Sequence, residues 1–241
     1  MLCNGIGAGL DLLQPFVDAV DSRIEVVRFD VPGVGGSPTP KTPYTFAMLA
    51  FLVARLLDQL RYQRFDVLGI SWGGGLAQQL AFQYPRRCRR LVLASTGTGM
   101  LMVPGGFSVL SKMLTRRRYR DPAYARAIAA ELYGGRLRQR PSEVRHLVYD
   151  QSRIGSRAGY LFQLLAGLGW SSLPALPLIR QPTLVLAGSD DPIIPLVNAR
   201  IMHRLLPHAV LHVFDDGHLG LVTAAEELGP LVSEFLRRPM S

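Results

Sequence analysis

Ser71 has the sequence context of a catalytic nucleophile. It stands between Gly69 and Gly73 in a Gly-x-Ser-x-Gly pattern, after the apolar run 65–70 and before a helical pattern that starts near Gly75. A strand that turns into a helix within about one residue leaves the serine strained and its hydroxyl exposed. Glycines on both sides remove the Cβ atoms that would collide there. The pattern predicts that Ser71 attacks acyl carbon atoms and forms an acyl-enzyme.

A serine nucleophile needs a general base, and histidine is the usual one. His218 follows the last predicted strand in a glycine-containing loop, on the edge of the sheet where Ser71 should emerge. We therefore expect His218 to be the base. Three other histidines are predicted to be structural: His203, His208 and His212. His146, in the 98–175 segment, is a minor candidate for contact with substrate.

The base needs an acid that orients its ring. Asp190 and Asp191 both follow an earlier predicted strand and precede His218, which gives the order Ser, Asp, His. The spacing from a preceding glycine and a following proline favours Asp191, with Asp190 as the second choice. Asp215 and Asp216 lie too near His218 in the chain to reach behind its ring, so we expect them to form capping or loop hydrogen bonds.

The tetrahedral oxyanion of acyl transfer needs two N–H donors. We assign one to the backbone N–H of Trp72, which directly follows the nucleophile, and the other to the Asn4-Gly5-Ile6 loop, at Ile6 N–H. Asp30 and the glycines that follow it are expected to shape a neighbouring loop and to have no catalytic role.

The elements that must position these residues alternate along the chain. Strands are predicted at 24–29, 65–70, 91–94, 182–187 and 210–214. Helices are predicted at 10–20, 46–61, 75–84, 197–206 and 224–237. This succession predicts an α/β fold, with a mostly parallel sheet and helices on both faces. Functional loops should then lie at the C-terminal ends of the strands.

Residues 98–175 interrupt the alternation. They are rich in arginine and aromatic residues and have mainly helical periodicity. We predict a helical cap at 98–175, inserted into a core formed by 1–97 and 176–241.

The net charge of +9 raises the possibility of a nucleic-acid partner. The excess is local, because residues 112–157 contain twelve Lys and Arg against four Asp and Glu, a net of +8. No helix-turn-helix, zinc-finger or RNP-like motif accompanies it, so we predict no nucleic-acid partner. Two interpretations stay open: a solvated basic surface, and an interaction surface for an anionic or amphiphilic partner.

Composition predicts a soluble protein of the cytoplasm. The two cysteines, Cys3 and Cys88, have neither metal-site spacing nor a disulfide framework. The first twenty residues contain two aspartates and no Lys or Arg, unlike a signal peptide. The longest apolar stretch, 46–54, is too short to span a bilayer. We therefore predict no membrane span, no metal and no cofactor.

Seven runs of the sequence resemble the intracellular poly(3-hydroxyalkanoate) depolymerases of bacteria, and the similarity covers nearly the whole chain. The runs are 3–8, 29–37, 71–74, 166–170, 180–188, 190–198 and 215–219. The resemblance implies an α/β-hydrolase fold and a serine hydrolase that degrades medium-chain-length storage polyester on cytoplasmic granules. It places the triad on Ser71, on one of Asp190 and Asp191, and on His218.

In that family more chain precedes the Asn-Gly-Ile-Gly loop, including the first strands and most of the strand that feeds the loop. That strand lies centrally, beside the strand that carries the serine. Only Met1-Leu2-Cys3 represents it here, so the N-terminal strands are expected to be missing. We favour a start codon placed too far downstream over an open gap beside the nucleophile strand.

The expected partner is a polyester granule or a small acyl ester, and the expected products are 3-hydroxyacid monomers or oligomers. The same residues leave two alternatives open. One is a serine esterase, thioesterase or 3-hydroxyacyl transferase on soluble substrates. The other is a non-catalytic granule-binding protein.

Overall fold

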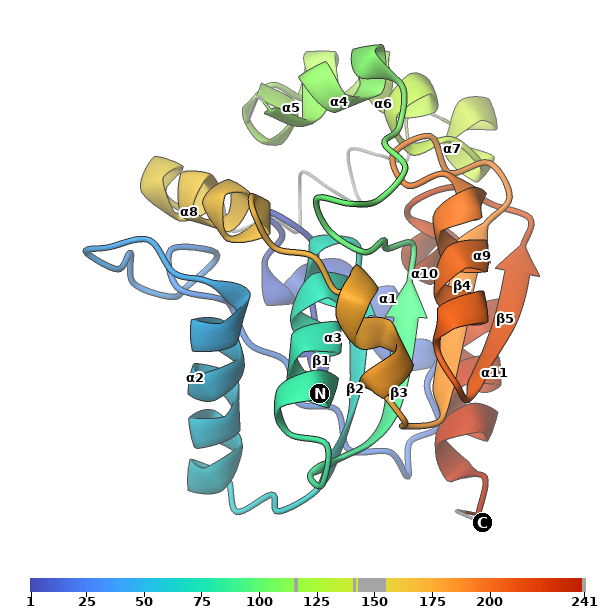
Figure 1. The fold of residues 1–241 in the computed structure, drawn as a ribbon. Coiled ribbons are helices and arrows are strands. Elements are labelled where there is room, and N and C mark those ends of the chain that lie inside the picture. The colour runs from blue at the N-terminus through green and yellow to red at the C-terminus, as the bar shows by residue number, and fades with distance from the viewer. Residues whose placement is uncertain (115–116, 141, 143–154, 240–241) are drawn as a thin grey trace.

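The computed structural model describes residues 1–114, 117–140, 142 and 155–239. A sheet of five parallel strands forms the centre of the molecule (Figure 1), in the order β1-β2-β3-β4-β5. The strands are β1 (Leu2–Cys3), β2 (Phe65–Ile70), β3 (Cys88–Ala94), β4 (Thr183–Gly188) and β5 (Ala209–Phe214).

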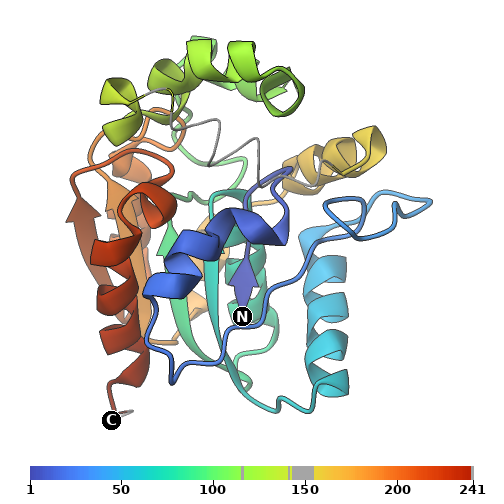
Figure 2. The ribbon, with the colours of Figure 1, turned by 180° about the vertical axis from the view of Figure 1, so that it is seen from behind.

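Alternate strand residues pack on opposite faces of the sheet, as the two-residue period of a strand requires. In β3, Leu91 and Leu93 face one layer of helices, whereas Val92 and Ala94 face the other. The first layer contains α2 (Phe46–Gln59), α3 (Trp72–Gln83), the 3-10 helix η4 (Leu173–Leu178) and α9 (Leu196–Leu205). The second, seen in Figure 2, contains η1 (Leu10–Leu13), α1 (Gln14–Ala19), α10 (Gly220–Thr223) and α11 (Ala225–Arg237).

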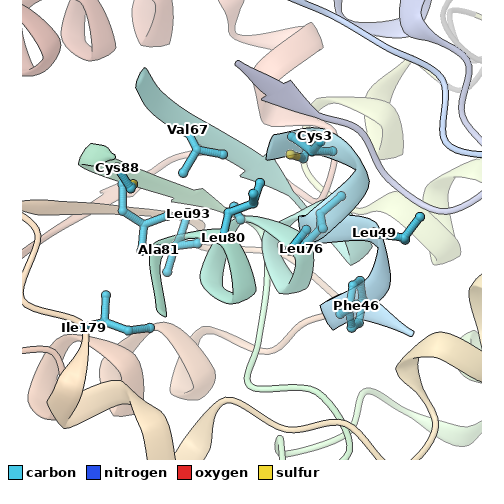
Figure 3. Close-up of a cluster of buried hydrophobic side chains, with 14 of the residues drawn as sticks. Cys3, Phe46, Leu49, Val67, Leu76, Leu80, Ala81, Cys88, Leu93 and Ile179 are labelled. Atoms are coloured by element: carbon cyan, nitrogen blue, oxygen red, sulfur yellow. The ribbon is translucent and has the colours of Figure 1, made fainter. Parts of the chain in front are cut away.

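Helix α3 is the central helix of the first layer, and its position determines where the nucleophile lies. Figure 3 shows Leu76 and Leu80 of α3 in one buried cluster with Val67 and Leu93 of the sheet. Both helix leucines are fully buried. The cluster therefore holds the start of α3 against the ends of β2 and β3.

The predicted strand at 24–29 is wrong as a regular element. Only an isolated bridge joins Arg28 to Leu2, together with a hydrogen bond from Leu2 N–H to Val27 O. The physical reason is the length of the neighbouring strand. Because β1 has only two residues, residues 24–29 have few backbone groups beside them with which to form a parallel ladder. β1 lies beside β2, with Cys3 opposite Gly69, but it is an edge strand among the described strands.

In the described part of the chain, five α-helices between β3 and β4 cover the ends toward which the strands point (Figure 1). They are α4 (Phe107–Leu114), α5 (Arg117–Arg120), α6 (Pro122–Tyr133), α7 (Arg136–Gln139) and α8 (Arg157–Gly167). Buried residues of α4, α6, α7 and α8 form a cluster with Ile6, Ile193 and Leu219 from the loops below. The division into a core and a cap at 98–175 stays a prediction, with which this placement agrees.

No helix in the described part of the chain has the length and apolar character needed to cross a membrane.

Candidate active site

Ser71 stands at a sharp turn between β2 and α3. Its backbone has φ 55° and ψ −124°, a left-handed conformation that costs a non-glycine residue about 1–3 kcal/mol. The flanking glycines are required by close packing. A Cβ on Gly69 would lie 2.3 Å from Gly73 O, and one on Gly73 would lie 2.1 Å from Cys3 O. The surrounding backbone therefore holds the strained turn in place.

The three residues of the predicted triad lie in one hydrogen-bonded line. His218 Nε2 is 3.0 Å from Ser71 Oγ, and His218 Nδ1 is 2.8 Å from Asp191 Oδ2. The other carboxylate oxygen of Asp191 accepts the N–H groups of Ile193 and Ile194, each at 2.9 Å. The side chains of Asp191 and His218 are 2% and 4% exposed. This geometry can orient the ring and remove a proton from the serine.

The loop that carries His218 is held from above by the turn between α6 and α7. His218 N–H donates to Tyr133 O at 2.8 Å. In the same loop, Asp216 Oδ1 accepts Arg136 N–H at 2.9 Å, and its Oδ2 accepts the Thr223 hydroxyl at 2.7 Å. Asp216 therefore makes the loop hydrogen bonds expected from the sequence. The sequence contained no sign that Tyr133 holds the histidine loop, because 85 residues separate the two positions.

Asp190, the second-choice acid, faces away from His218. Its carboxylate accepts hydrogen bonds from Arg138 at 2.5 and 2.9 Å and from Gly135 N–H at 2.8 Å. These hydrogen bonds, chiefly those of Arg138, hold the pKa of Asp190 below its ordinary value. Asp190 thus links helix α7 to the end of β4, one residue before the aspartate that contacts the histidine.

The Asn4-Gly5-Ile6 loop lies beside the nucleophile, where a Cβ on Gly5 would be 3.6 Å from Ser71 Cβ. Helix α8 holds both sides of this region through one buried residue that the sequence analysis missed. Gln163 Oε1 accepts Gly7 N–H, and Gln163 O accepts the indole N–H of Trp72, each at 2.8 Å. The roles of Ile6 and Trp72 N–H as oxyanion donors stay predictions that this placement supports.

A cavity of about 310 Å³ opens onto Ser71. This volume is near the lower end of the range for ligand pockets, roughly 300–1,000 Å³. The lining is mostly apolar and comes from both the predicted core and the predicted cap; it includes Phe46, Trp72, Met102, Leu164, Trp170 and Ile193. A second cavity of about 360 Å³ lies beside Met1 and Leu68, and its described lining does not include Ser71.

The remaining candidate residues lie elsewhere. His212 is in β5, and His203 is in the last turn of α9. His146 falls outside the described residues, as does part of the basic segment 112–157. Both cysteines are buried, and desolvation raises the pKa of the Cys3 thiol to about 12. No group of three potential metal ligands gathers in the described part of the chain.

Comparisons with known proteins identify the family of this chain. The alpha/beta hydrolase fold family matches residues 1–225. The chain is 51% identical over 238 residues to the poly(3-hydroxyalkanoate) depolymerase of Ectopseudomonas oleovorans, covering 99% of this chain and 84% of that protein. It is 26% identical to 3-oxoadipate enol-lactonase 2 of Acinetobacter baylyi, covering 98% and 87%.

Solved structures show the same fold. A hydrolase from Pseudomonas aeruginosa superposes with a TM-score of 0.80 at 26% identity, covering 98% of this chain and 89% of that one. The enol-lactonase from Burkholderia xenovorans superposes with a TM-score of 0.79 at 25% identity, covering 98% and 90%. The predicted fold class and the predicted resemblance are both confirmed. By sequence and by fold, this chain belongs to the α/β-hydrolase family and is a relative of poly(3-hydroxyalkanoate) depolymerases.

Proposed function

We propose that this hydrolase cleaves the ester bonds of poly(3-hydroxyalkanoate), with Ser71 as nucleophile, His218 as base and Asp191 as acid. One observation carries the proposal: Ser71, hydrogen-bonded to His218, opens into an apolar cavity in a chain 51% identical to a poly(3-hydroxyalkanoate) depolymerase. A polyester repeat offers both parts that such a site needs, an ester carbonyl for the serine and an alkyl group for the cavity.

The reaction starts when His218 Nε2 accepts the proton of Ser71 Oγ, and the oxygen bonds to the ester carbonyl carbon. The resulting tetrahedral oxyanion is stabilised by Trp72 N–H, the first N–H of α3, and by Ile6 N–H; losing one such donor typically costs about 3–4 kcal/mol. The histidine returns its proton to the departing alkoxide as the ester C–O bond breaks. Asp191 keeps Nδ1 protonated and stabilises the imidazolium.

Water completes the cycle. His218 removes a proton from a water molecule, whose oxygen bonds to the acyl carbon on Ser71. The bond between that carbon and Ser71 Oγ then breaks, His218 returns the proton to Ser71 Oγ, and a 3-hydroxyacid or an oligomer that ends in one is released. The helices of the proposed cap, 98–175, lie over the end of the sheet that carries the serine. One of them, α8, supplies Leu164 to the cavity lining.

The proposed location is the surface of storage granules in the cytoplasm. Support comes from three exposed leucines: Leu161 at 52% and Leu165 at 42% on α8, and Leu168 at 73% directly after it. Leu168 also lines the cavity, so the apolar surface continues from the cavity mouth onto the outer face of the helix. An apolar polymer surface is a partner that such a face can contact.

The test is Ser71→Ala, assayed for release of 3-hydroxyacids from amorphous polymer granules. We expect turnover to fall by about 10⁶-fold, to the background rate, with the circular dichroism spectrum unchanged. Labelling by a fluorophosphonate should occur in the wild-type chain and not in the variant. Full activity of Ser71→Ala would contradict the assignment, and a labelled wild-type chain excludes the non-catalytic granule-binding alternative.

A serine esterase or thioesterase for soluble acyl groups is the second candidate. The volume of the cavity favours it, because about 310 Å³ holds a single acyl group and does not itself require a polymer. Comparing the release of 3-hydroxyoctanoate from granules with the hydrolysis of nitrophenyl octanoate separates the two. Efficient hydrolysis of the soluble ester without release from granules would favour the second candidate.

A further inference from the structure

Gly75 is a buried residue of α3 that lines the apolar cavity, one helical turn after Ser71. It lines the cavity together with Phe46 and Trp170. A Cβ on Gly75 would lie 2.9 Å from Phe46 Cζ and 3.2 Å from Trp170 Cζ3. The first distance is closer than Cβ atoms approach other atoms in folded proteins, so a methyl group there would displace a ring.

The two rings have little room to move away from the cavity. Phe46 is 2% exposed, and its ring centroid lies 4.7 Å from those of both Trp72 and Trp170. The Trp170 indole N–H donates to Gln79 at 2.9 Å. On another side, Gly99 packs so closely that a Cβ there would lie 2.6 Å from Trp170 Cε3. A ring displaced by a methyl group on Gly75 would therefore move into the cavity.

We propose that Gly75 determines the length of the acyl chain that the hydrolase accepts, because its missing side chain leaves the inner end of the cavity open between Phe46 and Trp170. The ligand of this subsite is the terminal methyl and methylene groups of the alkyl chain of an acyl ester. The inference rests on the proposed function, which supplies the ester substrate. It adds the residue that selects among esters by the length of their acyl chain.

Two other glycines of the same cavity provide a comparison. A Cβ on Gly97 would meet the sulfur of Met102 at 2.8 Å, the mobile end of a flexible side chain. A Cβ on Gly167 would meet nothing within 4 Å. Gly167 also belongs to a helix, α8, so Gly167→Ala makes the same chemical change in the same cavity without pressing on a ring.

The experiment measures kcat/KM for nitrophenyl esters from butyrate to dodecanoate. In Gly75→Ala we expect the ratio of kcat/KM for octanoate to that for butyrate to fall about tenfold, because a pocket discriminates one or two methylene groups by this order. Gly167→Ala should keep the wild-type ratio. An unchanged ratio in Gly75→Ala, or an equal loss for every chain length, would overturn the proposal.

A second variant keeps the proposal falsifiable if Gly75→Ala does not fold. Phe46→Leu removes ring atoms from the contact, so alone it should shift the optimum to longer esters. Combined with Gly75→Ala, it should restore the octanoate-to-butyrate ratio to within about threefold of wild type. A wild-type length profile in Phe46→Leu would overturn the proposal.

These soluble esters separate the two ideas. If the wild-type chain hydrolyses them but releases nothing from granules, the polyester assignment fails while the role of Gly75 can still stand. If granules are degraded and the length profile does not respond to Gly75→Ala, the inference fails and the polyester assignment stands.

Discussion

Two adjacent aspartates at the end of β4 have opposite environments. Asp191 is buried, and its carboxylate is divided between His218 Nδ1 and two backbone N–H groups. Asp190 is partly exposed and is occupied by Arg138. Residue type cannot distinguish them, but burial and partner do. A carboxylate must remain ionised and in contact with the imidazole to hold the correct tautomer, and only Asp191 has that contact.

At this scale we predict a large difference between two identical substitutions. Asp191→Asn should lower kcat by about 10⁴-fold with little change in KM, because the amide favours the wrong histidine tautomer. Asp190→Asn serves as the matched control and should keep kcat within about threefold of wild type, because its partner belongs to α7. Steady-state kinetics on a soluble nitrophenyl ester checks both. Equal losses would contradict the assignment of Asp191 alone as the acid.

From the sequence we predict the site residues whose chemistry follows from local context. Ser71 is recognisable because glycine is required on both sides of it, and His218 because of its place after the last strand. The choice between Asp190 and Asp191 rested on loop spacing alone. The role of Gln163 could not be predicted from the sequence, because it depends on contacts with Gly7 and Trp72, which are 156 and 91 residues away.

Helix α7 is four residues long, yet it connects the proposed cap to both loops of the triad. Its Arg138 pairs with Asp190 beside the acid, and its Arg136 bonds Asp216 in the histidine loop, through the backbone at 2.9 Å. The guanidinium of Arg136 also donates to Thr223 O at 2.7 Å. An element this short gains stability from such contacts and not from helix propensity.

The Arg138–Asp190 pair gives a prediction about pH. The pKa of Asp190 is lower in the folded chain, so the pair stabilises the fold above the ordinary carboxyl pKa of about 4, and this stability is lost as the pH falls through the lowered value. Both side chains are nearly half exposed, which screens the interaction to about 0.5–1 kcal/mol.

Asp190→Asn should therefore reduce the unfolding free energy by about that amount at pH 7 and by progressively less below about pH 4. Urea denaturation at several pH values measures the difference. Asp58→Asn, at the Arg87–Asp58 pair of the core, provides a comparison far from α7. A constant difference across the acid range would contradict the ionic origin of the effect.

Regular elements were predictable where their pattern was self-contained. Helix α2 begins at the predicted Phe46, where the Thr45 hydroxyl caps Met48 N–H, and β2 has the predicted bounds. The strand at 24–29 was not predictable, because a strand also needs a partner of matching length. Local periodicity does not contain that information.

Across the whole molecule, one parallel sheet brings residues that are 147 positions apart in the sequence within hydrogen-bond distance at one end. The same end has the cavity and, along α8, the exposed leucines. The proposed catalytic centre and an exposed apolar surface therefore share one side of the molecule, an arrangement that supports the proposed action on an insoluble apolar substrate.

This arrangement predicts that polymer and soluble ester respond differently to one change. The double variant Leu161→Ser with Leu165→Ser removes apolar side chains from the outer face of α8, so turnover of granules should fall about tenfold. Hydrolysis of nitrophenyl butyrate should stay within about twofold. Leu60→Ser, at an equally exposed leucine after α2, should leave both activities unchanged. Equal losses on both substrates would indicate a damaged fold.

Gln163 connects the proposed cap to the region of the proposed oxyanion donors. One residue of α8 holds the Asn4-Gly5-Ile6 loop through Gly7, the residue after Ile6, and also holds the indole of Trp72. If α8 moved away from the core, Ser71 would keep its base, but the two N–H groups proposed for the oxyanion would lose their support. The enzyme would then be inactive whenever α8 stood far enough from the core to admit a polymer strand. Each ester bond would be hydrolysed only after α8 had closed over the strand.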